Sequence, residues 1–204
     1  MRSLVIGLTG IVLTLALASA AAAKKNNPNI SLEFIPQQAV GAAVANVSGA
    51  MLNRAVALHV ADGRQVDGPE IIGIRTDDDD RRHTLTATSD VLEYVETTLI
   101  DRAERWGVDF DAGSNLSLHV EVLEVDLLET NQAVGATYNA TVRLAYTFRK
   151  GGGAPEVEDS AFGDATRYGK KFSNDNVNEV LSDALLEAYA ALFSDRSLQR
   201  AWGE

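Results

Sequence analysis

Residues 136–150, ATYNATVRLAYTFRK, alternate between apolar and polar side chains over almost their whole length. Successive side chains of a β-strand point to opposite faces of the sheet, so this segment has one core-facing side and one solvated side. A helix would scatter the same apolar residues around its axis. The segment therefore predicts a long strand, whose core-facing side chains are Tyr138, Ala140, Val142, Leu144, Tyr146 and Phe148.

Strand-like segments also lie on both sides of this one. Residues 115–129, NLSLHVEVLEVDLLE, alternate with a change of parity, and a β-bulge near Leu123 or Glu124 would keep one face apolar. The composition of GGGAPE, residues 151–156, predicts a turn, and residues 157–172 form a weaker third strand. Together the three segments predict an antiparallel meander.

Two segments change to a helical period. Val91, Leu92, Val95, Leu99, Ala103 and Trp106 form one apolar stripe, with Ser89 as the expected N-cap and Gly107 as the C-terminal stop. A second stripe runs from Val177 to Leu192 behind a cap at Ser173 or Asn174. We expect residues 195–202 to add a short helical turn that packs back through Leu198 and Trp202.

The segment before the first helix adds one confident strand. Residues 56–61 have the alternation of a half-buried strand, and EIIGI at residues 70–74 extends or pairs with strand structure. The DDDDRR run, residues 77–82, is expected to be a charged loop. The predicted fold class is α+β, an antiparallel sheet of about four strands with two main helices packed on one face as a two-layer sandwich.

The N-terminus has the order of a secretory signal peptide. Residues 1–23 have a single cation at Arg2, then an apolar stretch, then small residues that end in three alanines before Lys24. We expect cleavage near Ala23 and a periplasmic location; the alternative is a membrane tether formed by the uncleaved segment. Residues 24–52, rich in Asn, Gln, Pro and small residues, predict a flexible segment, and residues 53–204 predict a single α+β domain.

Charge and composition exclude several partners and sites. The formal net charge is −11, so the surface repels phosphate backbones, and nucleic-acid binding is not expected. The sequence has no cysteine, which removes disulfides, thiol nucleophiles and thiolate metal sites together.

Three stretches resemble the YajG-like lipoproteins of Gram-negative bacteria in order, spacing and residue character. They are residues 83–110 (HTLTATSDVLEYVETTLIDRAERWGVDF), 138–148 (YNATVRLAYTF) and 172–199 (FSNDNVNEVLSDALLEAYAALFSDRSLQ). The resemblance implies a periplasm-facing protein with no assigned activity, usually tethered by an N-terminal lipid. This chain has Ala20 at the position of the lipidated cysteine, so any membrane association is not expected to depend on lipidation.

No pattern of residues predicts catalysis, a cofactor site or a metal site. The acidic run Asp77–Asp80 lacks the spacing of a calcium loop, and the three histidines, His59, His83 and His119, are each isolated in sequence. Carboxylate pairs such as Glu121 and Glu124 arise by chance in so acidic a chain. We therefore expect a protein that is not an enzyme and holds no cofactor or metal.

The third strand offers the one candidate binding surface. Tyr168, Lys170 and Lys171 lie at its end, where an exposed strand edge could pair with a partner. The sequence predicts a non-enzymatic cell-envelope protein, an accessory or protein-interaction module of the periplasm, whose partner is another envelope protein. The alternative is a soluble periplasmic carrier of a small apolar or glycan ligand held between sheet and helices.

Overall fold

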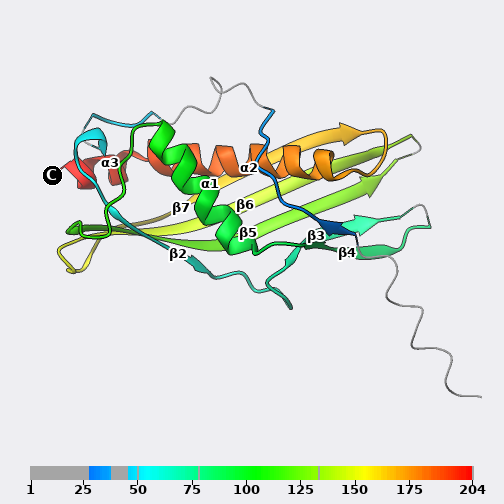
Figure 1. The fold of residues 1–204 in the computed structure, drawn as a ribbon, viewed down its shortest axis with the longest axis horizontal. Helices are drawn as coiled ribbons and strands as arrows, with labels where there is room; N and C mark the ends of the chain where they lie inside the picture. Colours follow the sequence, from blue (N-terminus) through cyan, green and yellow to red (C-terminus); the bar gives the residue numbers. More distant parts are fainter. Residues whose placement is uncertain (1–27, 38–45, 50, 78, 133, 204) are drawn as a thin grey trace, which may run out of the picture.

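The computed structural model describes residues 28–37, 46–49, 51–77, 79–132 and 134–203, and Figure 1 shows its ribbon. The predicted signal peptide, residues 1–23, lies outside these described residues. Within them the chain forms, in order, β1 (Asn29–Ile30), η1 (Met51–Asn53), β2 (Ala57–Asp62), β3 (Ile71–Thr76), β4 (Arg82–Ala87), α1 (Val91–Arg105), β5 (Leu116–Asn131), β6 (Ala136–Lys150), β7 (Pro155–Gly169), α2 (Asn174–Ser194) and α3 (Arg196–Gly203).

The long strands β5, β6 and β7 form the predicted antiparallel meander. The pairing of β5 with β6 shifts register between Val122 and Glu124, which confirms the predicted bulge. Because of that shift, both ends of β5 direct their apolar side chains to the same face. The turn between β6 and β7 holds Gly151 and Gly152 at positive φ (58° and 72°), as its composition predicts.

The expected antiparallel sheet of about four strands with two main helices is wrong. The described chain forms a seven-stranded mixed sheet in the order β1-β4-β3-β5-β6-β7, with β2 paired to β5 off this path, and it has three α-helices. The pairs β1–β4, β2–β5 and β3–β5 are parallel. The alternation of β2, β5 and β6 was readable from the sequence, but the choice of their neighbours was not.

The length of β5 explains the mixed sheet. β5 has 16 residues, so two short strands share the edge that β6 leaves open. β2 pairs with Ser117–Val122 and β3 with Leu127–Glu129. A parallel pair needs a crossover connection, and the segment that contains α1 provides it for both strands.

The helices lie together on one face of the sheet (Figure 1). The N-cap of α1 is Asp90 rather than the expected Ser89, because the Asp90 Oδ1 accepts hydrogen bonds from the Leu92 and Glu93 amides at 2.8 and 3.3 Å. Gly107, with φ 88°, ends the helix as predicted. Ser173 caps α2, which confirms one of the two expected residues.

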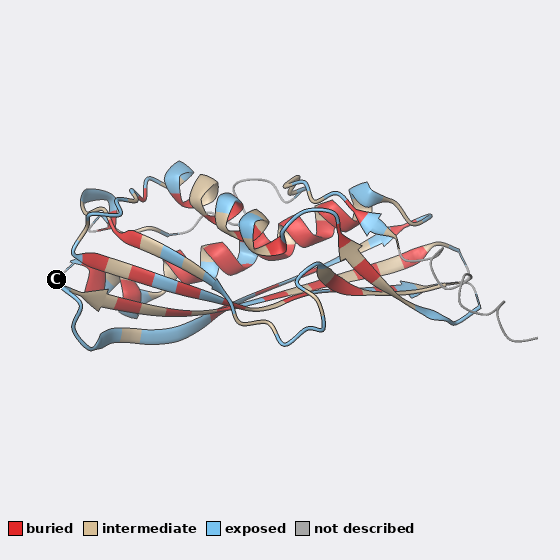
Figure 2. Ribbon diagram, turned by 60° about the horizontal axis from the view of Figure 1, so that its bottom comes forward, coloured by how far each residue is buried: buried red, intermediate tan, exposed pale blue. Residues whose placement is uncertain are grey.

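The core fills the layer between sheet and helices, where Figure 2 shows buried residues along the strands and α2. At the end nearest the C-terminus, the Trp202 indole stacks on Phe148, with ring centroids 5.5 Å apart. The indole Nε1 donates to the Arg54 carbonyl at 2.9 Å, and the Arg54 guanidinium donates back to the Trp202 carbonyl at 2.7 Å. The expected final helical turn therefore packs back as α3.

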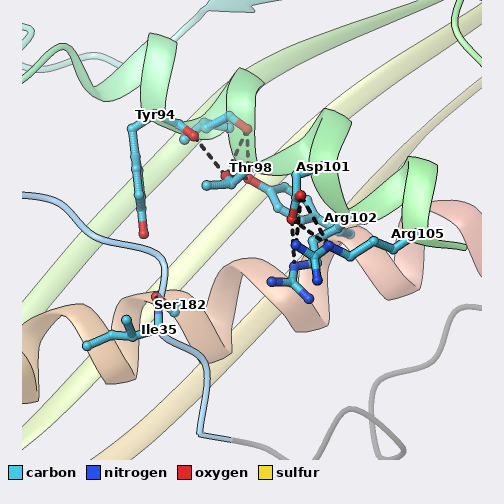
Figure 3. A network of polar contacts seen from close by, with 9 residues as sticks. Ile35, Tyr94, Thr98, Asp101, Arg102, Arg105 and Ser182 are labelled. Carbon is cyan, nitrogen blue, oxygen red and sulfur yellow. Dashed lines mark hydrogen bonds and ion pairs between the residues drawn. The ribbon is translucent and has the colours of Figure 1, made fainter.

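Part of the segment predicted to be flexible, residues 24–52, is described, and residues 29–37 lie against α1 and α2. Polar side chains of α2 form hydrogen bonds with the backbone of this segment at alternate residues. The Asn178 amide donates to the Ser31 carbonyl at 2.9 Å, and the Ser182 hydroxyl accepts from the Ile35 amide at 2.9 Å. We call residues 29–37 the strap; Figure 3 shows Ile35 beside Ser182, with Tyr94 of α1 above them.

Among the residues that the structure describes, no helix is both long enough and apolar enough to cross a membrane.

Candidate functional site

A polar pocket of about 400 Å³ opens where β3, β5 and β6 meet the segment between β7 and α2. It contains two of the three residues that the sequence singled out, Lys170 and Lys171. Its lining residues are Arg75, Glu129, Asn131, Gln132, Gly135, Ala136, Lys170, Lys171 and Phe172. We call it the sheet-end pocket.

Tyr168, the third predicted residue, lies outside this lining. It is 51% exposed near the end of β7, and its hydroxyl donates to the Val134 carbonyl in the turn between β5 and β6. β7 is an edge strand of the sheet, as expected. Two of its backbone amides donate to side chains of the same chain. The Ser160 amide donates to the Asp159 carboxylate at 2.8 Å, and the Asp164 amide donates to the Glu187 carboxylate at 3.2 Å. Pairing of a partner strand with this edge stays a prediction.

An ion pair between Arg75 and Glu129 forms one wall of the pocket. The two residues are register partners on β3 and β5, and the Arg75 Nε lies 2.9 Å from the Glu129 Oε2. The Glu129 side chain is 1% exposed, whereas that of Arg75 is 31% exposed. A buried carboxylate needs a cationic partner to offset its desolvation, so this pair is part of the fold as well as of the pocket.

Two aromatic side chains hold this ion pair in place. The Arg75 guanidinium lies over the Phe172 ring, with the Cζ atom 4.4 Å from the ring centroid. The Tyr138 hydroxyl lies 3.4 Å from the Glu129 Oε1 and donates to the Lys171 carbonyl at 3.2 Å. Burial, and next the negative charge of Glu129, raise the pKa of Tyr138 to about 12, so the hydroxyl remains a proton donor at neutral pH.

The lining of the pocket carries more positive than negative charge. Glu129 is the one acid among the lining residues, beside three cations. A chain with a formal net charge of −11 therefore has a locally positive concave site.

Sequence reasoning found the two lysines and missed Arg75 and Glu129. One signal was available, because Glu129 continues the core-facing parity of Val125 and Leu127 along β5. A carboxylate at an inward strand position needs a buried cation. The partner could not be named, since Arg75 is 54 positions away and meets Glu129 only through the parallel pairing of β3 with β5.

The histidines predicted to be isolated are not all isolated in space. His59 and His119 are register partners on β2 and β5, and their rings stack with centroids 4.6 Å apart. His83 bonds the Asp77 carboxylate at 2.7 Å between β3 and β4, and Asp79 and Asp80 of the expected charged loop also lie between these strands. The described part of the chain contains no group of three or more His, Asp or Glu residues that could hold a metal ion.

A second hollow, of about 430 Å³, lies beside the bulge of β5, between the end of β2 and the start of β3. Its polar side chains include Arg64, Glu124 and Asp126. Arg64 is committed to Asp62 through two hydrogen bonds, at 2.9 and 2.7 Å, and Glu124 lies 3.4 Å from Arg143. These pairings leave the hollow without the surplus cations of the sheet-end pocket.

Comparison with solved structures supports the fold. A DUF330 protein from Xanthomonas campestris superposes with a TM-score of 0.53 at 14% sequence identity, over 86% of this chain and 97% of that chain. A minor lipoprotein from Acinetobacter baumannii matches with a TM-score of 0.40 at 11% identity, over 70% of this chain and 94% of the other. No protein-family model matches the sequence, and no curated protein does.

The first of these structures shows that the mixed sheet with its helices occurs in another bacterial protein. At this identity the similarity concerns the fold alone. A YajG-like assignment in particular stays a prediction.

Proposed function

We propose that this protein is an exported cell-envelope protein that acts as a binding module rather than as an enzyme, and that its ligand or partner contacts the sheet-end pocket. The observation that carries the proposal is the pair of lysines at a concave site of an acidic protein. A positive pocket on a negative surface attracts an anionic group specifically to that place.

Two further observations support the proposal. The order of basic, apolar and small residues over residues 1–23 is typical of a secretory signal peptide, which supports export of the domain from the cytoplasm. The one acid in the pocket lining, Glu129, is tied to Arg75 and Tyr138, so it is poorly placed to act as a general base.

The alternative role, as a carrier of a ligand between sheet and helices, has less support. A carrier needs a cavity in that layer, and there the structure has closely packed side chains. Gly163 of β7, for example, lies so close to α2 that an added Cβ would come within 2.1 Å of the Ala184 carbonyl oxygen.

Photo-crosslinking in intact cells tests the proposed binding surface. A benzophenone amino acid replaces Lys170 in one variant and Glu158, an exposed residue of β7, in a control variant. We expect a defined adduct from position 170 that weakens when Lys171→Glu is added, and no such adduct from position 158. Equal adducts from both positions, or an adduct at 170 that is insensitive to Lys171→Glu, would contradict the proposal.

A further inference from the structure

We infer that the sheet-end pocket binds a phosphate group, carried by a small ligand or by a lipid headgroup. The inference rests on the proposed function, since it names the ligand class of the same site. It is based on the charge of the pocket, the fixed positions of the Arg75 guanidinium and the Lys171 backbone, and the size of the pocket.

The charge of the lining favours a dianion over a monoanion. Lys170, Lys171 and Arg75 contribute three positive charges and Glu129 one negative charge, which leaves a surplus of two. A phosphate monoester carries about two negative charges near neutral pH, whereas a carboxylate carries one. A bound phosphate would therefore neutralise the site, and a carboxylate would neutralise half of it.

The Arg75 guanidinium and the backbone at Lys171 are held in position before any ligand arrives. The Arg75 guanidinium is fixed on one side by Glu129 and on the other by the Phe172 ring. The backbone at Lys171 is fixed as well, because its carbonyl accepts hydrogen bonds from the Tyr138 hydroxyl at 3.2 Å and the Asn176 amide at 3.1 Å. Prior fixing of this kind lowers the conformational entropy that the protein loses when a ligand binds.

The donor chemistry and the volume also fit a phosphate ester. Each lysine ammonium offers three N–H donors to phosphate oxygens, and charge-assisted bonds of this type are among the stronger ones. A volume of about 400 Å³ exceeds that of a phosphate alone, so it leaves room for the group to which the phosphate is attached. The partly exposed Phe172 provides an apolar surface for that group.

The test is a titration of the purified full-length protein with inorganic phosphate and pyrophosphate, followed by the amide NMR signals of residues 170–172. We expect saturable shifts at these residues and at Arg75. The double variant Lys170→Gln/Lys171→Gln should weaken binding by about tenfold or more, since it removes two charge-assisted contacts. The matched control is Lys150→Gln, outside the pocket lining at the end of β6, which should leave the affinity unchanged.

Vesicles of phosphatidylcholine with and without phosphatidic acid distinguish the two sources of phosphate. Binding of free phosphate with no vesicle binding indicates a soluble ligand, and lysine-dependent binding to phosphatidic acid vesicles indicates a lipid headgroup. Thermal unfolding of the double variant checks that the fold is retained, as exposed lysines predict. The absence of saturable binding in both assays, or binding that the double variant retains in full, would overturn the inference. A specific crosslink at position 170 without phosphate binding would overturn the inference and leave the proposed function standing.

Discussion

Gly163 shows how closely single residues determine the packing of this fold. It lies on β7 under α2, and an added Cβ would come within 2.1 Å of the Ala184 carbonyl oxygen and 2.5 Å of the Ala188 amide nitrogen. Both atoms belong to the backbone of α2, so the strain could be relieved only by movement of the helix or the strand. The missing side chain at position 163 therefore determines how closely α2 approaches the sheet.

Gly163→Ala should destabilise the protein by about 1–3 kcal/mol, because overpacking forces the backbone of α2 away from β7. Urea unfolding followed by circular dichroism measures the change. Gly49→Ala is the matched control, since an added Cβ there meets nothing within 4 Å. Equal unfolding midpoints for the two variants would show that α2 does not lie this close to β7.

The stacked side chains of His59 and His119 predict that the stability of the fold depends on pH. Burial lowers the pKa of His119 below its ordinary value of 6.5, and the charges of His59 and Arg149 lower it further. Between 6.5 and the lowered pKa, the unfolded chain binds more protons than the folded one, so stability falls as the pH decreases through this range.

His119→Gln should therefore reduce the loss of stability between about pH 7 and about pH 5, where an ordinary histidine titrates. The measurement is the urea midpoint of both proteins at the two pH values. His83→Gln is the comparison, because His83 bonds Asp77 rather than another histidine. An equal pH dependence in wild-type protein and His119→Gln would contradict the assigned cause.

At the scale of elements, the strap is held by side chains whose positions within α2 determine its path. Asn178 and Ser182 are four residues apart and buried, so they lie on one face of the helix and project toward the strap backbone. Ser182 also donates to the Glu33 carbonyl at 3.3 Å, and Asp183 accepts from the Gln37 amide at 2.8 Å. The side chains of α2 therefore hold the strap mainly by hydrogen bonds to the strap backbone.

Ser182→Ala should detach the middle of the strap, because it leaves the Ile35 amide without its acceptor. We expect a loss of about 1–2 kcal/mol in unfolding free energy, the usual cost of an unsatisfied donor. Hydrogen exchange at the Ile35 amide should become faster than in the control Ser160→Ala, whose serine is exposed on β7. Unchanged exchange at Ile35 would contradict the strap contact.

The same scale shows how much of the fold could be predicted from the sequence. The alternation of residues 136–150 identified β6, and the helical stripes identified α1 and α2, because local periodicity records which face is buried. The pairing of β2 and β3 along one edge of β5 depends on long-range register, which no local pattern encodes. For the same reason, Lys170 and Lys171 were found as an exposed pair, and the pocket around them was not.

At the scale of the whole molecule, the seven-stranded sheet carries helices on one face (Figure 1). The positive pocket lies where β3, β5 and β6 meet the segment between β7 and α2. The whole chain has a formal net charge of −11, so the residues outside the pocket are strongly acidic, and an anionic ligand would be repelled elsewhere and attracted to the pocket. Added salt should therefore weaken phosphate binding at the pocket, since it screens exposed charges.

Export from the cytoplasm is the claim on which the proposed function depends most directly. Cell fractionation of the native protein, with mass determination of its mature N-terminus, measures it. We expect a chain that starts near Lys24 in the soluble periplasmic fraction, after cleavage beyond the small residues that end at Ala23. A chain that retains residues 1–23 and sediments with the membrane fraction would contradict this expectation.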